Sequence, residues 1–385
     1  MKLAFITANY PCAARPAAGT FMRQFVWAMA RQGHDCSVIS PVRWLDRRLG
    51  PFPPRIAQEE AGAGAPVTVC RPRHLTFSSL DLGFTHTARW ANATFYAAAI
   101  RALAQAGIRP DLVYGHFLYF GGHAASRVGR RLGVPAVVGV GEGEFWTIRP
   151  AGPTRAAREM KRATAFLAVS TCIAEELERT LNVPRENIAV FPNGVDLTVF
   201  RPRNRAEMCR KLGLPEQTFN VGFAGSFIAN KGYPQLIEAV SGLEDVRLVL
   251  LGRGQHPPHD PHTAFCGPVA HADIPDYFGA CDLYVLPTRI EGSCNSVIEA
   301  MACGLPIVTS NGRYMDDIVD GATAVRVDPT DVRAIRGAIL ALRDDPDRRR
   351  RMSAACLEKA KTFDINERAR RVGDWMQSLI GNGRT

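Results

Sequence analysis

Short apolar runs rich in β-branched residues alternate with longer amphipathic stretches along this chain. Runs bounded by Gly, Pro and polar residues predict buried strands, and the stretches between them have helical spacing. In the first half we predict strands at residues 3–7, 36–40, 67–70, 112–114, 136–140, 166–169 and 188–191. The predicted helices there include residues 21–32, 86–106, 124–132 and 171–181. This alternation is typical of an α/β fold with a mainly parallel sheet covered by helices.

A second series of the same kind follows. Its predicted strands are residues 221–224, 247–251, 263–265, 283–286, 307–309 and 324–327. Two successive series predict two Rossmann-like domains, which bind ligands at the carboxyl ends of their strands. Prolines and an Asn-Gly turn interrupt regular structure in residues 192–202, so we expect a first domain over residues 1–195 and a second over residues 196–365.

The composition is that of a globular protein. The chain has 385 residues, of which 46% are hydrophobic and 22% are charged. We find no apolar run near the roughly 20 residues that span a bilayer, and the first residues do not form a signal peptide, so we expect a cytoplasmic protein. The ten cysteines are scattered, without Cys-x-x-Cys pairs or zinc-finger spacing. They predict reduced, mostly buried thiols and no metal site.

The formal net charge of +10 indicates what kind of partner to expect. Basic residues gather in the first half, at Arg43, Arg47, Arg48, Arg55, Arg71, Arg73, Arg127, Arg130, Arg131, Arg149, Arg155, Arg158, Lys161 and Arg162. Such a surface attracts anionic lipid head groups or a phosphorylated acceptor, possibilities that the sequence leaves open. Because no recognised nucleic-acid-binding motif accompanies the charge, we do not expect a nucleic acid partner.

The most informative segment is residues 289–309, which contains two carboxylates, Glu291 and Glu299. If residues 296–302 are helical, Glu291 precedes the helix and Glu299 lies about one turn inside it. A helix N-terminus favours anions, because its first amides have no intrahelical partner and the macrodipole is positive there. A ligand with phosphate groups flanked by hydroxyls would satisfy both features, and a nucleotide sugar has this chemistry.

The string from Glu291 and Gly292 to Ile-Glu-Ala-Met-Ala-Cys-Gly-Leu-Pro-Ile-Val resembles the donor-binding signature of retaining glycosyltransferases of family 4, the glycosyl transferases group 1. The resemblance covers most of the chain. It implies the GT-B fold, in which two Rossmann-like domains with mainly parallel sheets face an interdomain cleft. It also implies that the last helix, about residues 366–380, returns to the first domain, so that residues 366–385 join it.

The resemblance assigns donor-binding roles in the second domain. Gly225 and Ser226 follow its first strand, and Lys231 comes shortly after them, where the family has Gly-Arg and then Lys-Gly. The family's two cations clamp the diphosphate of the donor. Lys231 matches, but Ser226 replaces the arginine, so the second charge is missing or comes from Arg253 or Arg289. The other donor-binding residues that the resemblance implies are Gly252, Arg253, Gly267, Val269, Gly292, Asn295 and Ser296.

Three positions in the first domain also match the family. Gly19 ends the loop after the first strand, where family members let the backbone approach the donor. His116 stands at a strand's carboxyl end, where it could bind a phosphate or orient the acceptor, or be a buried histidine bonded to backbone. Many members have His-Gly-x-Asp after the fifth strand. Here Gly141 replaces the histidine, Glu144 matches the acid, and Glu142 is an additional carboxylate.

Together these features predict a metal-independent, retaining glycosyltransferase that needs no cofactor beyond its nucleoside diphosphate sugar. The candidate catalytic residues are Lys231, Glu291, His116 and Glu144. Lys231 and the amides near Asn295 offset the charge of the leaving diphosphate, while Glu299 holds the ribose and Glu291 a sugar hydroxyl. The basic first half favours a lipid-linked acceptor at the inner membrane face, as in exopolysaccharide or cell-envelope synthesis.

Three alternatives remain. A GT-B 2-epimerase would isomerise the sugar nucleotide, although the signature around Glu291 argues against it. A non-catalytic subunit that binds a sugar nucleotide would explain the departures at Gly141 and Ser226. A nicotinamide dehydrogenase is disfavoured because the first loop lacks Gly-x-Gly-x-x-Gly. The sequence does not identify the sugar, the base, the acceptor or the oligomeric state.

Overall fold

The structure is a computed structural model that describes residues 1–382 apart from 17, 45–51, 63, 78–79, 84–85, 255–257 and 259. Arg47 and Arg48 of the basic first half therefore lie outside the described residues. The chain divides into two compact units. Unit 1 comprises Met1–Pro192 and Ile365–Thr385, and unit 2 comprises Asn193–Asp364.

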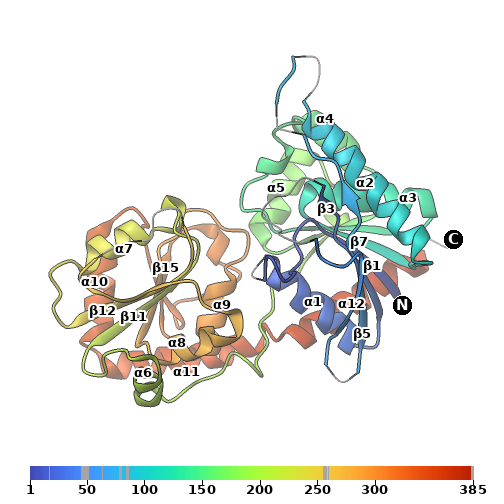
Figure 1. The fold of residues 1–385 in the computed structure, drawn as a ribbon. Helices are drawn as coiled ribbons and strands as arrows, with labels where there is room; N and C mark the ends of the chain where they lie inside the picture. Colours follow the sequence, from blue (N-terminus) through green and yellow to red (C-terminus); the bar gives the residue numbers. More distant parts are fainter. Residues whose placement is uncertain are drawn as a thin grey trace. The chain divides into compact units, whose positions relative to one another are not determined.

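Unit 1 is built on an eight-stranded sheet with the order β10-β9-β8-β7-β1-β2-β5-β4 (Figure 1). All neighbours are parallel except β4, which is antiparallel to β5. Its strands are β1 (Lys2–Ile6), β2 (Asp35–Ile39), β4 (Ile56–Glu60), β5 (Pro66–Cys70), β7 (Leu112–His116), β8 (Ala136–Val140), β9 (Ala165–Ala168) and β10 (Ile188–Val190). Two short strands, β3 (Val42–Arg43) and β6 (Arg73–His74), pair separately.

Helices cover both faces of this sheet, because successive side chains of a strand point to opposite sides. In β1, Leu3 and Phe5 belong to one buried cluster, while Ala4 and Ile6 belong to another. The first cluster includes α1, α4, α5 and α12, and the second includes α2 and α3. The helices of unit 1 are α1 (Thr20–Arg31), α2 (Ala88–Gln105), α3 (His123–Leu132), α4 (Pro153–Met160), α5 (Thr171–Leu181) and α12 (Ile365–Asn382).

The C-terminal helix α12 is tied to unit 1 by a buried arginine. Arg368 is 9% exposed, and its Nε donates a hydrogen bond to the carbonyl of Pro192 at 2.6 Å. Its guanidinium also lies 4.6 Å from the ring centroid of Phe25 on α1. Burial lowers the pKa of Arg368 to about 10, so the side chain remains a cation at neutral pH. These contacts hold a segment that is distant in sequence against the first sheet.

Unit 2 has a six-stranded parallel sheet with the order β13-β12-β11-β14-β15-β16. Its strands are β11 (Phe219–Ala224), β12 (Val246–Leu251), β13 (Thr263–Gly267), β14 (Leu283–Leu286), β15 (Ile307–Ser310) and β16 (Ala324–Val327). Its helices are α6 (Arg205–Leu212), α7 (Tyr233–Val240), α8 (Ile274–Gly279), α9 (Asn295–Ala302), α10 (Val332–Arg343) and α11 (Pro346–Lys361). One core of buried aliphatic and aromatic side chains fills the unit.

Each strand that we predicted from an apolar run is present in one of the two large sheets. Its predicted bounds agree with the observed ones to within a few residues. The prediction did not include β4, in whose sequence, Ile-Ala-Gln-Glu-Glu, three of the five residues are polar. As the edge strand, β4 alternates exposed and half-buried residues and therefore has no continuous apolar run. All ten cysteines are free thiols. Among the described residues, we find no helix that is long and apolar enough to cross a membrane.

Candidate functional site

The strand order of unit 2 reverses direction between β11 and β14. Sheets of this kind bind ligands at the carboxyl ends of their strands, at such a switch point. The segment that follows β11 carries Lys231, and the segment that follows β14 carries Glu291. The topology therefore brings two residues that are distant in sequence to the place where a ligand is expected.

Lys231 and Glu291 form an ion pair between Nζ and Oε1. The side chains are only 24% and 11% exposed. Burial alone would lower the pKa of Lys231, but the Glu291 carboxylate more than offsets this effect, so the pKa lies above its ordinary value. The Thr288 hydroxyl lies 3.1 Å from the same carboxylate oxygen and orients it. Lys231 is thus a fixed cation at neutral pH.

Gly232 brings the loop that carries Lys231 against the end of β14. Its φ of +73° is left-handed, and a Cβ at this position would lie 2.0 Å from the carbonyl oxygen of Pro287. Only glycine permits this approach. The amide of Arg289 then donates to the carbonyl of Asn230 at 2.9 Å, which joins the two loops directly.

Helix α9 begins at Asn295, as the sequence predicted to within one residue. Cys294 precedes it, and the Cys294 side chain makes no capping hydrogen bond. The Asn295 side chain accepts a hydrogen bond from Asn193 Nδ2 at 2.8 Å. The neighbouring predicted residues are Gly292, which is buried before the helix, and Ser296, which is half-buried in its first turn.

The two predicted carboxylates have different partners. Glu291 lies before α9 and pairs with Lys231, whereas Glu299 lies one turn inside the helix. Glu299 Oε1 is 2.8 Å from His271 Nε2, and the His271 ring packs edge-on against Phe200 at 5.1 Å between centroids. His271 did not figure in the prediction, because it follows a strand in a stretch without a recognisable motif.

Three predicted glycines lie side by side at the carboxyl edge of the sheet. The amide of Gly225 donates to Leu251, and the amide of Gly252 donates to Gly267, both at 2.9 Å. A Cβ on Gly252 would lie 1.9 Å from the Gly225 carbonyl oxygen, so the backbones are in close contact there. The side chains of the other predicted residues after these strands differ in exposure: Ser226 and Arg253 are exposed, and Val269 is half-buried.

Unit 1 has its own switch point between β1 and β7, because β2 lies on the other side of β1. Gly19, after β1, has a left-handed φ of +71°, and a Cβ there would lie 2.3 Å from the carbonyl oxygen of Asn9. His116 is the last residue of β7 and is 6% exposed. Its Nδ1 shares a hydrogen bond of 3.0 Å with the Tyr114 hydroxyl rather than with backbone.

Burial, assisted by the positive charge of Arg368, lowers the pKa of His116 to about 3. His116 is therefore neutral at physiological pH. Phe21 and Phe117 also enclose its ring, with centroids at 5.0 and 4.3 Å. In this state the imidazole can donate or accept one hydrogen bond, but it cannot supply a positive charge.

The acidic segment after β8 contains one buried and one exposed carboxyl group. Glu142 is 4% exposed and accepts hydrogen bonds from the Thr147 hydroxyl at 2.6 Å and from the Leu118 amide at 3.3 Å. Burial raises its pKa to about 7, although these hydrogen bonds act in the opposite direction. The predicted catalytic residue Glu144 is instead exposed and pairs with Arg149 at 3.3 Å.

Gly141, which replaces the family's histidine, has room for a side chain. A Cβ there would meet Val169 at 3.6 Å and Phe117 at 3.8 Å, which are ordinary contacts. A steric clash at the Cβ position therefore does not explain why this chain has glycine where the family has histidine.

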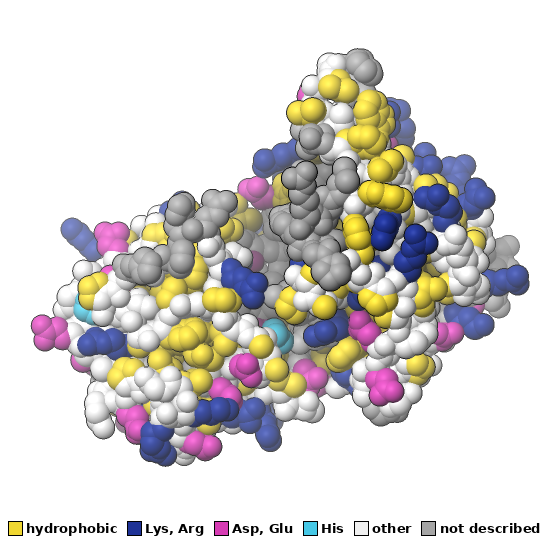
Figure 2. Space-filling model, in the orientation of Figure 1, with side chains coloured by type: hydrophobic (Ala, Val, Ile, Leu, Met, Phe, Trp, Pro, Cys, Tyr) yellow, Lys and Arg dark blue, Asp and Glu magenta, His cyan; other side chains and the backbone are white. Residues whose placement is uncertain are grey.

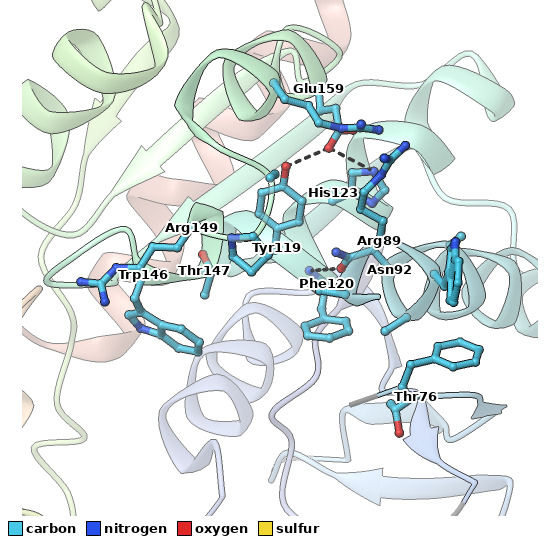
Figure 3. Close-up of a pocket in the computed structure, with 18 of the residues that line it drawn as sticks. Thr76, Arg89, Asn92, Tyr119, Phe120, His123, Trp146, Thr147, Arg149 and Glu159 are labelled. Atoms are coloured by element: carbon cyan, nitrogen blue, oxygen red, sulfur yellow. Dashed lines mark hydrogen bonds and ion pairs between the residues drawn. The ribbon is translucent and has the colours of Figure 1, made fainter. Parts of the chain in front are cut away.

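A cavity of about 910 Å³ opens on unit 1 beside this segment (Figure 3). Its wall comes from Arg43 of β3, residues 76–77 after β6, the start of α2, the irregular turn at Phe117–Gly122, the first half of α3, the segment after Glu144, and α4. Aromatic side chains line it at Phe77, Trp90, Tyr119, Phe120 and Trp146. Thr147, which holds Glu142, also lines it. The sequence did not predict this cavity, because its lining residues come from many separate segments of the chain.

The turn that forms part of the cavity wall has an unusual backbone. Phe117 and Phe120 have φ values of +65° and +57°, which are uncommon for residues with a side chain. Two hydrogen bonds stabilise the turn: Leu118 donates to Glu142, and Phe120 donates to Asn92 Oδ1 at 3.2 Å. Figure 3 shows the second of these at the centre of the cavity wall.

Two family profiles match this chain. "Glycosyltransferase Family 4" matches residues 18–199, and "Glycosyl transferases group 1" matches residues 218–345. The first covers most of unit 1 and the second most of unit 2, so between them they account for both candidate regions described above.

Individual relatives agree with this result. The chain is 26% identical over 356 residues to the putative teichuronic acid biosynthesis glycosyltransferase TuaC of Bacillus subtilis, covering 88% of each chain. Its fold is similar to sucrose-phosphate synthase from Thermosynechococcus elongatus, with a TM-score of 0.77, 18% identity, and 99% and 100% of the two chains covered. It is also similar to Anabaena HepE in complex with UDP, with a TM-score of 0.72, 16% identity, and 98% and 100% covered.

These matches confirm the predicted α/β architecture and the resemblance seen in the donor signature. With both units matched and the GT-B fold present over its whole length, the chain belongs to the family 4, group 1 glycosyltransferases, which are EC 2.4 enzymes that use nucleotide sugars.

Proposed function

We propose that this glycosyltransferase moves a sugar, with retention of configuration, from a nucleoside diphosphate sugar to a lipid-linked or polysaccharide intermediate of cell-envelope synthesis. TuaC, whose name refers to teichuronic acid, supports the choice of pathway. HepE, which has also been solved with UDP-glucose, supports a uridine nucleotide as the first donor to test.

The observation that carries the proposal is the Lys231–Glu291 ion pair at the switch point of unit 2. A lysine buried to this degree needs a compensating anion. In the structure Glu291 supplies it, and a bound diphosphate would become a second partner. Because Lys231 stays protonated, it can stabilise the charge that develops on the diphosphate as the glycosidic bond breaks.

The other residues of unit 2 position the donor in this proposal. The first turn of α9 presents the Ser296 amide to the diphosphate, and the Asn295 amide, which donates to the Ser293 carbonyl at 3.0 Å in the structure, lies beside it. The three adjacent glycines let the backbone approach the nucleotide, and Glu299 binds the ribose. Glu291, released in part from Lys231, accepts a hydrogen bond from a sugar hydroxyl.

In unit 1 we assign polar roles to three groups at the end of the sheet. His116 is neutral and can hydrogen-bond a hydroxyl or a phosphate oxygen. Glu142 has a pKa of about 7, so it can hold or release a proton near neutral pH. Glu144, paired with Arg149 at the surface, is a candidate for contact with the acceptor.

The donor site can be tested with a panel of UDP-, GDP-, ADP- and dTDP-sugars, by thermal shift and by release of the nucleoside diphosphate. We expect one nucleotide to stabilise the wild type, and Lys231→Ala to weaken its binding about 10- to 100-fold, as for a charge-assisted hydrogen bond of about 1.5–3 kcal/mol. Lys211→Ala is the matched control, because Lys211 also pairs with a carboxylate in unit 2 but is exposed.

Equal losses in both variants would show that the effect is not specific to the site. Donor binding without transfer to any acceptor fraction would favour a non-catalytic subunit, and formation of an isomerised donor would favour an epimerase.

Unit 1 also has the surface expected of an enzyme that works at an anionic membrane. Five large apolar side chains at the approach to α2 are 41% to 55% exposed, namely Leu75, Phe77, Leu80, Leu82 and Trp90. Figure 2 shows Lys and Arg side chains beside hydrophobic ones on the part of unit 1 that carries α2, α3 and α4. We expect the protein to sediment with anionic vesicles at low salt; protein that stays in the supernatant would rule out this peripheral location.

A further inference from the structure

A second, strongly basic pocket adjoins the cavity on unit 1. Its volume is about 540 Å³. Its lining residues, which we call the arginine pocket, are Tyr96, His123, Arg127, Arg130, Arg131, Arg155, Glu159 and Arg162. His123, Arg127, Arg155 and Glu159 line the cavity as well, so the two spaces lie side by side and share these side chains.

The arginine pocket has a large excess of positive charge. Its five arginines and single glutamate give a net charge of +4 when His123 is neutral. Glu159 is occupied by three partners within unit 1: Arg155 at 2.8 Å, the Tyr119 hydroxyl at 2.8 Å and His123 Nε2 at 3.7 Å (Figure 3). It therefore does not neutralise the remaining arginines.

The structure does not otherwise account for this concentration of charge. Arg130 and Arg131 lie in the last turn of α3, where the helix dipole favours cations. The dipole does not explain Arg127, in the middle of α3 and stacked on Tyr96 at 4.1 Å, or Arg162, which follows α4. Guanidinium groups from two helices thus converge on one concave surface.

One buried ring nitrogen in the same pocket lacks a hydrogen-bond partner in the described part of the chain. His123 is 7% exposed, and its Nδ1 has no hydrogen-bond partner among the described residues. The imidazole stacks on the Tyr119 ring, with centroids 5.7 Å apart and planes at 11°, so its orientation is fixed. A buried unpaired ring nitrogen is costly, and a ligand oxygen in the pocket would satisfy Nδ1 in the form of the imidazole that carries a proton there.

We propose that the arginine pocket binds the phosphate or diphosphate group of an amphipathic acceptor whose apolar chain lies along the aromatic cavity. Arginine suits phosphate because its planar fork forms paired, charge-assisted hydrogen bonds. Phe77, Trp90 and Trp146 offer the apolar surface beside it. This assignment rests on the proposed function, and it places the charged end of the acceptor at α3 and α4. That position is next to the cavity that Thr147 lines, and Thr147 in turn donates a hydrogen bond to Glu142.

Binding can be measured by calorimetry with three probes: inorganic diphosphate, farnesyl diphosphate and farnesol. We expect farnesyl diphosphate to bind at least tenfold more tightly than either of the others, because only it uses both spaces. The double variant Arg130→Ala/Arg162→Ala should weaken both diphosphate probes about tenfold or more. Arg158→Ala, the matched control on α4 outside the pocket, should stay within about twofold of wild type.

The contributions of the ligand's apolar chain and of its diphosphate to binding can be measured separately. Trp90→Ala should weaken farnesyl diphosphate but leave inorganic diphosphate unchanged. All titrations are repeated with Lys231→Ala, so that binding of diphosphate at the donor site is removed. The variants in unit 1 replace exposed side chains, and circular dichroism spectra identical to wild type would show that they and Lys231→Ala fold.

Several outcomes would overturn the proposal. If Lys231→Ala abolishes all diphosphate binding, the donor site is the only anion site. If farnesol binds as tightly as farnesyl diphosphate, the arginine pocket does not recognise phosphate. If Arg130→Ala/Arg162→Ala bound both diphosphate probes as tightly as wild type and still transferred sugar from the donor, the pocket assignment would fail. The proposed function would then stand.

Discussion

The buried carboxyl of Glu142 should make the stability of unit 1 depend on pH. Its ordinary pKa is 4.5, and burial raises the folded-state value to about 7. Below pH 4.5 both the folded and the unfolded chain keep the proton. Between pH 4.5 and 7 the unfolded chain releases it while the folded unit holds it, so the free energy of unfolding falls as pH rises. Above pH 7 the folded unit carries the full free-energy cost of ionising the buried Glu142 carboxyl.

The size of the penalty follows from the pKa difference. One pKa unit corresponds to about 1.36 kcal/mol, so the interval from 4.5 to about 7 gives a ceiling of about 3 kcal/mol. Glu142→Gln retains an oxygen that accepts from Thr147 and Leu118, but it cannot ionise. We therefore expect this variant to lose the pH dependence between 5 and 8, and to gain up to about 3 kcal/mol over wild type at pH 8.

Urea unfolding followed by tryptophan fluorescence tests this expectation. All five tryptophans of the chain belong to unit 1, so the signal reports that unit alone. With a slope of about 2–3 kcal/mol per molar urea, the midpoint of Glu142→Gln at pH 8 should lie about 1 M above wild type. Comparing the pH slopes cancels any constant cost of burying the amide.

The matched control is Glu144→Gln, which makes the same chemical change two residues away at an exposed site. It should leave the pH slope unchanged. Parallel slopes for wild type and Glu142→Gln would refute the reasoning, because they would show that Glu142 ionises in the folded unit as it does in the unfolded chain.

Two smaller predictions concern the switch points. His116 should stay neutral through the physiological range, so its ring protons should show no titration in NMR spectra from pH 8 down to about 5; a midpoint near 6.5 would contradict its burial. Gly232→Ala should abolish tight donor binding because its Cβ would meet the Pro287 carbonyl oxygen at 2.0 Å, whereas Gly242→Ala, at a similar φ with open space around it, should cost only about 1 kcal/mol and keep donor affinity. Hydrogen exchange of unit 2 measures the loss of stability in each variant, and donor titration measures the loss of affinity. Similar losses in Gly232→Ala and Gly242→Ala would mean that backbone strain alone causes the effect.

Much of the fold could be predicted because buried parallel strands are continuous apolar runs. Such runs are independent of tertiary context, so β11 through β16 were found from sequence alone. The edge strand β4 was not predicted, because three of its five residues are polar. In the same way, the helix position of Glu299 followed from local spacing, but its partner did not: His271 reaches it from another segment, and no local pattern records that contact.

The site in unit 1 shows a different limit. Two carboxyl groups stand two residues apart in the segment Gly-Glu-Gly-Glu, and sequence gives no means of telling which is buried. The family pattern pointed to Glu144, which is exposed, whereas the backbone turn at Leu118 encloses Glu142. The arginine pocket was visible in the sequence only as a general excess of charge, because its members become neighbours through the packing of α3 and α4.

The chain therefore holds positive charge in two physically different ways, and salt should tell them apart. Lys231 is half-buried and paired one-to-one with Glu291, so a diphosphate there replaces or shares an existing partner, with little long-range attraction. The arginine pocket instead holds uncompensated charge, much of it on exposed guanidinium groups, whose attraction for anions is screened beyond about 8 Å at physiological ionic strength. The first arrangement favours selectivity for the geometry of one diphosphate. The second favours capture of an anionic chain end from a distance, which is what an enzyme needs when its acceptor is held at a charged surface.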